Sequence, residues 1–198
     1  MPKPKAIVYI DGLNLQRRLV DQIDSSVWVD YWGLVARVLP NFEILKVRVF
    51  TTLVPTPEGT VAETRWREQL QMHSNLSIHL GRIKKTTRVY PLASSNGIAT
   101  QNGSVKVLKY EEKGSDVALA AHMIRDAFSE DASIQYLMTS DTDFEPVIKM
   151  LKTEFGKRVG ILCTTKNFPK LFSNLNPEDI RHVKVSHVKK SLLKSLSP

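Results

Sequence analysis

Ala6-Ile7-Val8-Tyr9-Ile10-Asp11 is a nearly unbroken apolar run that ends at a carboxylate. Such a run predicts a strand that is covered on both faces, as in a parallel sheet. Four further runs of the same kind follow at residues 44–50, 76–80, 134–138 and 159–163. The first run therefore predicts one strand of a parallel sheet, with Asp11 at its carboxyl end.

Helical patterns lie between most of the predicted strands, at residues 13–20, 31–39, 60–73, 115–128 and 144–154. In the fourth pattern, helical spacing predicts that one side packs on the sheet, namely Val117, Ala120, Ala121 and Ile124. Alternating strands and helices predict an α/β fold.

The segment from Gly81 to Glu112 departs from this alternation, because cations and apolar residues alternate there around a polar stretch at residues 94–97. It predicts an inserted basic β-hairpin at about residues 82–110. Residues 178–198 predict a last strand near 180–185 and a terminal helix near 187–196. We expect one domain over residues 1–198, with its core at residues 6–163, because no linker interrupts the chain.

The chain is basic, with a net charge of +8 and a pI near 9.6, which favours a polyanionic partner such as nucleic acid. No apolar run approaches the roughly 18 residues that cross a bilayer, and the N-terminus lacks the pattern of a secretory signal. The lone Cys163 lies in an apolar run and predicts a buried thiol. These features favour a cytoplasmic protein that does not bind membranes.

Two common kinds of site are absent from the sequence. The five histidines and Cys163 lack the spacing of zinc ligands. No glycine-rich phosphate loop is present, which argues against a nucleotide triphosphatase.

Carboxylates follow two of the predicted strands and open one predicted helix. Asp11 follows the first strand, Asp141 and Asp143 follow the strand at 134–138, and Asp116 opens the helix at 115–128. Ligands of parallel α/β sheets bind beyond the carboxyl ends of the strands. If these two strands are neighbours, the carboxylates converge there and raise one another's pKa. A magnesium ion would relieve this repulsion and activate a water molecule, so the pattern predicts metal-assisted phosphodiester hydrolysis.

Helix capping is the alternative explanation for these residues, because Ser, Thr and Asp are common N-caps. Residues 140–143 all stand before a predicted helix, and one of them is expected to cap it. Capping gives no reason for carboxylates at both Asp141 and Asp143, nor for Asp11 after an apolar strand. For Asp116 alone, the local sequence supports a cap and a ligand about equally.

Three motifs together carry a resemblance to a known family. They are Tyr9-Ile10-Asp11-Gly12-Leu13-Asn14, Lys113-Gly114-Ser115-Asp116-Val117-Ala118-Leu119 and Thr139-Ser140-Asp141-Thr142-Asp143-Phe144-Glu145-Pro146-Val147-Ile148. In this order and spacing, over about residues 6–163, the chain resembles the NYN-domain family. That family is a branch of the PIN-like nuclease superfamily and includes LabA-like proteins.

The resemblance implies a three-layer α/β/α fold with a mainly parallel, PIN-like (Rossmann-like) sheet, and endoribonuclease activity on single-stranded or structured RNA. It also implies a divalent-metal site, with Asp11 and Asp141 as ligands, directly or through water. Asp116 and Asp143 would complete the acidic pocket. Asn14 would orient a phosphate or a metal-bound water, and Ser140 would form a hydrogen bond in the same pocket.

His122 is a departure from the family pattern, in which many relatives carry a further aspartate at this place in the middle helix. A neutral imidazole there removes one negative charge near the pocket, which would weaken metal binding or shift the preference toward manganese. The alternative is that His122 is peripheral and structural.

Basic residues of the hairpin and of the first helix are the expected RNA-binding surface, because Lys and Arg bind phosphates and bases stack on aromatic planes. The residues are Arg17, Arg18, Arg82, Lys84, Lys85, Arg88, Lys106, Lys109 and Lys113. For each hairpin residue, a merely solvated cation is about equally well supported.

The leading hypothesis is a Mg²⁺- or Mn²⁺-dependent endoribonuclease with the catalytic residues Asp11, Asn14, Asp116, Asp141 and Asp143. The alternative is an RNA-binding or assembly module with little or no turnover. An aspartyl phosphotransferase would need a second Asp two positions after Asp11, where Leu13 stands. DNA as a substrate and a homodimeric assembly both stay open.

Overall fold

The computed structural model describes residues 2–23, 28–52, 57–93, 99–165 and 176–193. Six strands form one sheet in the order β3-β2-β1-β6-β7-β8, and every neighbouring pair is parallel. Their bounds are β1 Lys5–Asp11, β2 Glu43–Thr51, β3 Leu76–Leu80, β6 Ile134–Met138, β7 Val159–Cys163 and β8 Ile180–His182.

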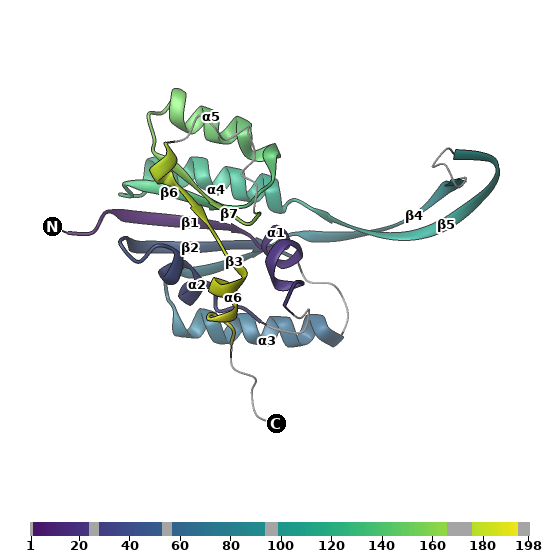
Figure 1. Ribbon diagram of the computed structural model, residues 1–198, viewed down its shortest axis with the longest axis horizontal. Coiled ribbons are helices and arrows are strands. Elements are labelled where there is room, and N and C mark those ends of the chain that lie inside the picture. Colours follow the sequence, from purple (N-terminus) through teal and green to yellow (C-terminus); the bar gives the residue numbers. More distant parts are fainter. Residues whose placement is uncertain (1, 24–27, 53–56, 94–98, 166–175, 194–198) are drawn as a thin grey trace.

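Helices cover both faces of this sheet, as Figure 1 shows. The α4 and α5 helices cover one face, at Ser115–Ser129 and Glu145–Thr153. The other face carries α1 Gly12–Leu15, the π-helix η1 Gln16–Val20, α2 Tyr31–Val38, α3 Pro57–Met72 and α6 Val185–Lys189. The described residues also include two short 3₁₀ helices, η2 at Thr142–Phe144 and η4 at Pro177–Asp179. The three-layer α/β/α fold with a parallel sheet is therefore confirmed.

The apolar runs form strands because both of their faces are buried. Ala6, Val8 and Ile10 pack into the core beneath α1 and α2, while Ile7 and Tyr9 pack toward α4 and α5. All residues of β6 and β7 are buried as well. Burying both faces removes the polar alternation that a half-exposed strand would show.

The order of the strands reverses between β1 and β6. From β1 the chain builds outward to β2 and β3, and it then crosses back to place β6 on the other side of β1. Ile10 pairs with Met138, so the carboxyl ends of β1 and β6 lie side by side. Such a reversal is where open α/β sheets bind their ligands.

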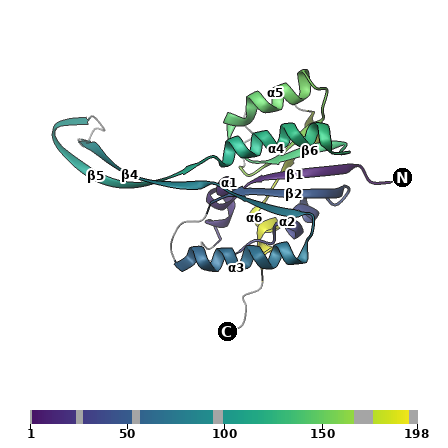
Figure 2. The ribbon, with the colours of Figure 1, turned by 180° about the vertical axis from the view of Figure 1, so that it is seen from behind.

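A long hairpin connects β3 to α4 and projects away from the body of the protein (Figures 1 and 2). It consists of β4 Arg82–Ala93 and β5 Ala99–Lys113, paired antiparallel from Arg82↔Lys113 outward. The predicted basic hairpin is confirmed, and β5 continues to Lys113, beyond the expected end at 110. The predicted polar stretch at residues 94–97 lies outside the described residues.

Both ends of the hairpin root meet at Thr51, the last residue of β2. The Gly81 amide donates to the Thr51 carbonyl oxygen at 2.8 Å, and the Ser115 hydroxyl approaches the same oxygen at 3.4 Å. The root is thereby attached to the carboxyl edge of the sheet.

Three local predictions need correction. The first helix is divided into α1 and η1. At the C-terminal end the strand is only Ile180–His182 and the helix runs over Val185–Lys189, not near 187–196. The helix stops because the chain then pairs with the segment before α2: Asp30 donates its amide to the Ser191 carbonyl, and Leu193 to that of Trp28. Residues 194–196 lie outside the described residues.

The third correction concerns the buried side of α4. Of the four predicted residues, Ala120 and Ile124 are half-buried against the core, whereas Ala121 is exposed and Val117 is 75% exposed. The buried apolar residues of the helix are Leu119, Met123 and Ala127. Asp126 is also buried on this side, at 1% exposure.

No helix within the described residues is long and apolar enough to span a membrane.

Candidate active site

An acidic pocket of about 540 Å³ lies at the carboxyl ends of β1 and β6, beside the root of the hairpin. Its walls come from the end of β1, from α1 and η1, from the base of β5, from the start of α4 and from the loop after β6. The residues that line it are Asp11, Leu13, Asn14, Arg17, Arg18, Lys109, Tyr110, Glu111, Glu112, Asp116 and Asp141. We call this the acidic pocket.

Asp11 is held rigidly at the end of β1. It caps α1: one carboxylate oxygen accepts from the Asn14 amide at 3.0 Å, and the other accepts from the Thr139 hydroxyl at 2.9 Å. Burial raises the pKa of Asp11, the two hydrogen bonds and Arg17 lower it, and Asp141 raises it. The chain can turn here because residue 12 is glycine, whose absent Cβ would lie 2.7 Å from the Cβ of Thr51.

Asp141 lines the acidic pocket and also caps the turn that follows β6. Its Oδ1 accepts from the Asp143 amide at 3.0 Å, and its own amide donates to the Thr139 hydroxyl oxygen at 3.0 Å. Thr139 therefore connects the carboxylate of Asp11 to the backbone of Asp141. Asp143 is exposed and is not among the lining residues, although its charge contributes to the pKa of Asp116.

Asp116 is not the cap of α4. The N-cap residue is Gly114, with a φ of 100° that favours glycine. The carboxylate of Glu112 accepts from the Ser115 amide at 2.9 Å and from its hydroxyl at 2.7 Å. Because Glu112 accepts the hydrogen bond from the first amide of the helix, the Asp116 carboxylate is not needed as a cap and is available to a ligand.

Asp116 has a strongly raised pKa in the acidic pocket. Shielding from water by the pocket walls raises its pKa to about 6, together with the charges of Asp11, Glu112, Asp141 and Asp143. Several carboxylates thus share one small region, which costs free energy unless a cation or a proton neutralises them.

This pKa gives a first prediction, for thermal unfolding in EDTA. The folded-state pKa of Asp116, about 6, is above its ordinary value of 3.8, so its ionisation destabilises the fold at neutral pH and not near pH 4. Asp116→Asn should therefore unfold at a higher temperature than wild type at pH 7.5, and the difference should close as the pH falls from 6 toward 4. Glu154→Gln, the same charge change at an exposed site on the end of α5, should show no such pH-dependent difference. A constant difference across this pH range would contradict the prediction.

Asn14 joins the acidic pocket to the end of β7. Its Oδ1 accepts from the Ser140 amide at 3.2 Å and from the Thr164 hydroxyl at 2.6 Å. The hydroxyls of Ser140 and Thr164 lie 2.7 Å apart. Since these bonds use the oxygen of the Asn14 amide, its Nδ2 hydrogens are the part that a ligand can use.

Three of the nine predicted cations line the acidic pocket: Arg17, Arg18 and Lys109. Glu111 pairs with Lys109 at 3.0 Å and with Lys113 at 3.3 Å, which lowers the pKa of Glu111 to about 2. Arg88 lies 3.8 Å from the same carboxylate. The others lie outside the pocket lining and are exposed on the hairpin: Arg82, Lys84, Lys85 and Lys106. The structure thus brings together the base of the hairpin and η1, but not the whole predicted set.

His122 lies outside the pocket lining, in an aromatic cluster between α4 and the sheet. Its ring centroid is 4.3 Å from that of His79 and 5.3 Å from that of Phe50. Burial lowers the pKa of both histidines, to about 4 for His79, so both imidazoles are neutral at pH 7. The missing family carboxylate therefore alters this cluster and not the lining of the acidic pocket.

The donors of the acidic pocket fit a hard divalent cation. Its carboxylate and amide oxygens are the ligand type that Mg²⁺ and Mn²⁺ accept, and the raised pKa values of Asp11 and Asp116 reflect negative charge that a cation would offset. Across the described segments, no three His, Cys, Asp or Glu side chains are already grouped as ligands of one ion. Magnesium is commonly held by one or two carboxylates, with water in the remaining positions. Asp11 and Asp141 suit that mode of binding.

The fold resembles a crystal structure of a protein of unknown function from Vibrio parahaemolyticus. The TM-score is 0.59 at 16% sequence identity, over 96% of this chain and 97% of that one. At this identity the likeness concerns the fold alone.

A curated relative is 6-hydroxy-3-succinoylpyridine 3-monooxygenase HspA of Pseudomonas putida, which is 20% identical over 152 residues. The match covers 72% of this chain and 46% of the relative, so the chain spans less than half the length of that protein. A family model, the NYN domain, matches residues 5–180, which include the acidic pocket and most of the chain. By this match the chain belongs to the NYN domain family.

Proposed function

We propose that this protein is a metal-dependent endoribonuclease that hydrolyses RNA phosphodiester bonds in the acidic pocket. NYN domains belong to the PIN-like nuclease superfamily, which supports a hydrolase that acts on RNA. The observation that carries the proposal is the position of Asp11, Asp116 and Asp141, which line one pocket where the strand order reverses, beside cations of η1 and β5.

Each part of the pocket has a role in this proposal. Asp11 and Asp141 hold a Mg²⁺ or Mn²⁺ ion, directly or through water, while Asp116 and Asp143 add negative charge around it. When bound, the ion supplies Lewis-acid activation of the phosphoryl group and of the attacking water. Thr139 fixes the carboxylate of Asp11 through its hydroxyl, and Ser140 and Thr164 fix the amide of Asn14.

The cations of the pocket wall orient the substrate. Arg17, Arg18 and Lys109 neutralise phosphates on either side of the bond to be cleaved, and Nδ2 of Asn14 donates to a phosphate oxygen. Asp116 has a pKa of about 6, which suits it to accept a proton from the attacking water near neutral pH. Hydrolysis then breaks one P–O bond and leaves a phosphomonoester and a free hydroxyl group.

Metal binding itself is testable without turnover. Adding Mg²⁺ or Mn²⁺ should raise the unfolding temperature of the wild type, because a ligand that binds only the folded state stabilises it. Asp141→Asn should abolish this increase, and Glu154→Gln should preserve it. An increase of the same size in Asp141→Asn would place the metal elsewhere and contradict the ligand assignment.

The hairpin is proposed as the RNA-binding arm. Lys84, Lys85 and Lys106 are exposed and have no ion pair with a described residue, so they are free to bind phosphates. Changing all three to glutamine should lower the slope of log affinity against log salt by roughly 0.7 for each lost contact with single-stranded RNA. Fluorescence anisotropy between 50 and 200 mM salt, roughly the range over which such contacts weaken, measures this slope.

The control for the hairpin carries the same loss of charge on α5 and just after it: Lys149, Lys152 and Lys157 changed to glutamine. This variant should retain the slope of the wild type. Equal losses in both triple variants would mean that net charge, and not the hairpin, controls affinity.

An RNA-binding module without turnover is the alternative function, favoured by His122, where many relatives carry an acid. Under this alternative the acidic pocket binds RNA without cutting it. Cleavage by the wild type distinguishes the two functions.

A further inference from the structure

The two faces of the projecting hairpin carry different side chains. In an antiparallel pair, directly opposite residues lie on the same face, and successive residues of a strand alternate between the faces. The register of β4 and β5 is regular from the root to Pro91↔Ser104. It places six charged residues on one face: Arg82, Lys84, Arg88, Lys109, Glu111 and Lys113. We call this the cationic face.

The opposite face carries much less positive charge. It holds the two remaining cations of the hairpin, Lys85 and Lys106, and the carboxylate of Glu112. The contact of Lys85 with Tyr110 agrees with this assignment, because its Nζ lies 5.9 Å from the centroid of that ring on the same face. Five cations with one carboxylate, against two with one, make the cationic face the stronger attractor of phosphates.

Glu111 holds several cations of this face beside one another. Its side chain is 14% exposed, and its carboxylate lies 3.0 Å from Lys109 and 3.3 Å from Lys113. From the other strand, Arg88 approaches it at 3.8 Å. One carboxylate does not neutralise three cations, so positive charge remains on exposed side chains. Cations that are already positioned lose less conformational entropy when they bind a phosphate.

The cationic face begins at the acidic pocket. Lys109 and Glu111 line that pocket and also belong to this face. The face then follows the arm outward, over about 20 Å from Arg82 to Arg88 at about 3.3 Å per residue. Tyr90 comes next on the same face and is 40% exposed. A phosphate chain that leaves the acidic pocket on this side meets a series of cations and then an aromatic ring.

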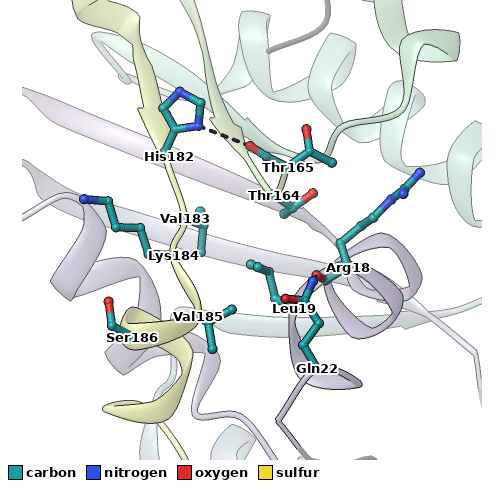
Figure 3. A pocket seen from close by; sticks show the side chains of 10 residues that line it. All are labelled: Arg18, Leu19, Gln22, Thr164, Thr165, His182, Val183, Lys184, Val185 and Ser186. Carbon is teal, nitrogen blue, oxygen red and sulfur yellow. Dashed lines mark hydrogen bonds between the residues drawn. The ribbon is translucent and has the colours of Figure 1, made fainter. Parts of the chain in front are cut away.

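The far side of Arg18 is less suited to continue the path of the RNA. A second pocket of about 730 Å³ lies there, between η1 and the chain that follows β7 and β8 (Figure 3). Figure 3 shows that Arg18 and Lys184 point apart on opposite sides of it. Leu19 and Val183 are only 5% and 4% exposed, and the amide nitrogen of Gln22 already donates to the Arg18 carbonyl oxygen. This pocket gathers neither cations nor an exposed apolar surface, whereas the arm has both.

We propose that single-stranded RNA leaves the acidic pocket along the cationic face of the arm, with phosphates against Lys84 and Arg88 and a base stacked on Tyr90. The identity of the chain as RNA rests on the proposed function. A base is free to stack on an aromatic side chain only when it is unpaired, so this path selects single strands. Among the hairpin lysines proposed above to bind phosphates, Lys84 contributes most, because it alone lies on this face.

Two double variants on neighbouring residues test the choice of face. Lys84→Gln with Arg88→Gln removes two cations from the cationic face, and Lys85→Gln with Lys106→Gln removes two from the opposite face. Fluorescence anisotropy measures binding of the full chain to a labelled oligouridylate in EDTA. The first double variant should bind about tenfold more weakly than the wild type near physiological salt, since two phosphate contacts are lost. It should also bind clearly more weakly than the second.

Lys149→Gln with Lys152→Gln is the control, because it removes the same charge from α5. It should bind as the wild type does. Equal weakening by the two hairpin variants would overturn the choice of face, and so would wild-type binding by Lys84→Gln with Arg88→Gln.

Tyr90→Leu and Tyr90→Phe test the stacking. Leucine keeps an apolar side chain opposite Val105 but has no planar ring, whereas phenylalanine keeps the ring. Binding should weaken at least about fivefold in Tyr90→Leu and stay at the wild-type level in Tyr90→Phe. Far-ultraviolet circular dichroism verifies that the strands of each variant are retained. Equal binding by the two variants would overturn the assignment of Tyr90.

The outcomes also separate this inference from the proposed function. If the cationic-face variant alone binds RNA weakly but the wild type never cleaves RNA, the path along the arm stands and the nuclease does not. Cleavage by a wild type whose binding is weakened equally by both hairpin variants gives the reverse conclusion.

Discussion

Asp11→Asn is expected to abolish RNA cleavage while RNA binding persists or becomes tighter. The substitution keeps the shape of a buried side chain that accepts bonds from Asn14 and Thr139, so the fold should survive it. It removes the carboxylate that is best placed to hold the metal, and metal activation contributes several kcal/mol to such reactions. We expect kcat to fall by at least about a thousandfold.

The assay is cleavage of labelled RNAs and single-stranded DNAs with Mg²⁺, Mn²⁺ or EDTA, with binding measured separately in EDTA. Asp131→Asn is the control, because Asp131 is an exposed aspartate just before β6, at the opposite end of the strands from the acidic pocket. It should cleave at the wild-type rate. Unchanged cleavage by Asp11→Asn would remove the acidic pocket from the mechanism, and binding without cleavage by the wild type would favour the RNA-binding module.

Asp126→Ala is expected to cause the largest loss of stability, although Asp126 lies outside both pockets. Its carboxylate accepts from the Tyr9 hydroxyl at 2.9 Å, from Arg48 at 2.6 Å and from Arg125 at 2.6 Å. The Arg48 side chain is only 12% exposed. Removing its partner leaves a cation poorly hydrated between α4 and the sheet, which costs about 3–5 kcal/mol.

Urea unfolding at pH 7 measures this loss. Arg125→Ala is the control, since the Arg125 side chain is 53% exposed and its pair with Asp126 should contribute at most about 1 kcal/mol. The pKa of Asp126 is held below its ordinary 3.8 by Arg125, Arg48 and Tyr9, against the effect of burial. The stabilisation is therefore present at neutral pH and is lost as the pH falls from about 3.8 through the lower pKa of the folded state. A loss below 1 kcal/mol at pH 7 would contradict the assignment.

The sheet and the convergence of Asp11, Asp116 and Asp141 were predictable from the sequence. Strands buried on both faces appear in the sequence as apolar runs. The first hydrophilic residue after such a run marks the carboxyl end of the strand, where ligands bind. The convergence depended on the assumption that β1 and β6 are neighbours in the sheet, and the strand order confirms it.

The supporting residues of the acidic pocket were not predictable in the same way. Thr139 and Thr164 act only through hydrogen bonds to Asp11 and Asn14 across 128 and 150 residues of chain. Glu112 caps α4 from the end of a hairpin strand. The sequence does hold one indication of this cap: Glu112 stands three residues before Ser115, where a carboxylate can reach the first amides of a helix.

Apolar spacing alone predicts the buried side of α4 only in part, since Ala120 and Ile124 pack against the core but Val117 and Ala121 are exposed. Leu119, Met123 and Ala127 also recur with helical spacing, but the buried Asp126 lies among them. From the sequence alone, a charged residue at that position indicates a solvated face of the helix. Arg48 comes from β2, far away in sequence. Periodicity cannot anticipate a buried charge whose partner lies on another element.

The root of the hairpin separates the projecting arm from the body of the protein. Gly81 and Ser115 both meet the carbonyl of Thr51, which fixes the root of the hairpin, and Lys109 to Glu112 at the base of β5 line the acidic pocket. Adding or deleting two residues in each strand beyond the Thr86–Lys109 pair would change the length of the arm by about 6.6 Å without moving a carboxylate of the acidic pocket. The length and sequence of the arm beyond its root can therefore change independently of the acidic pocket.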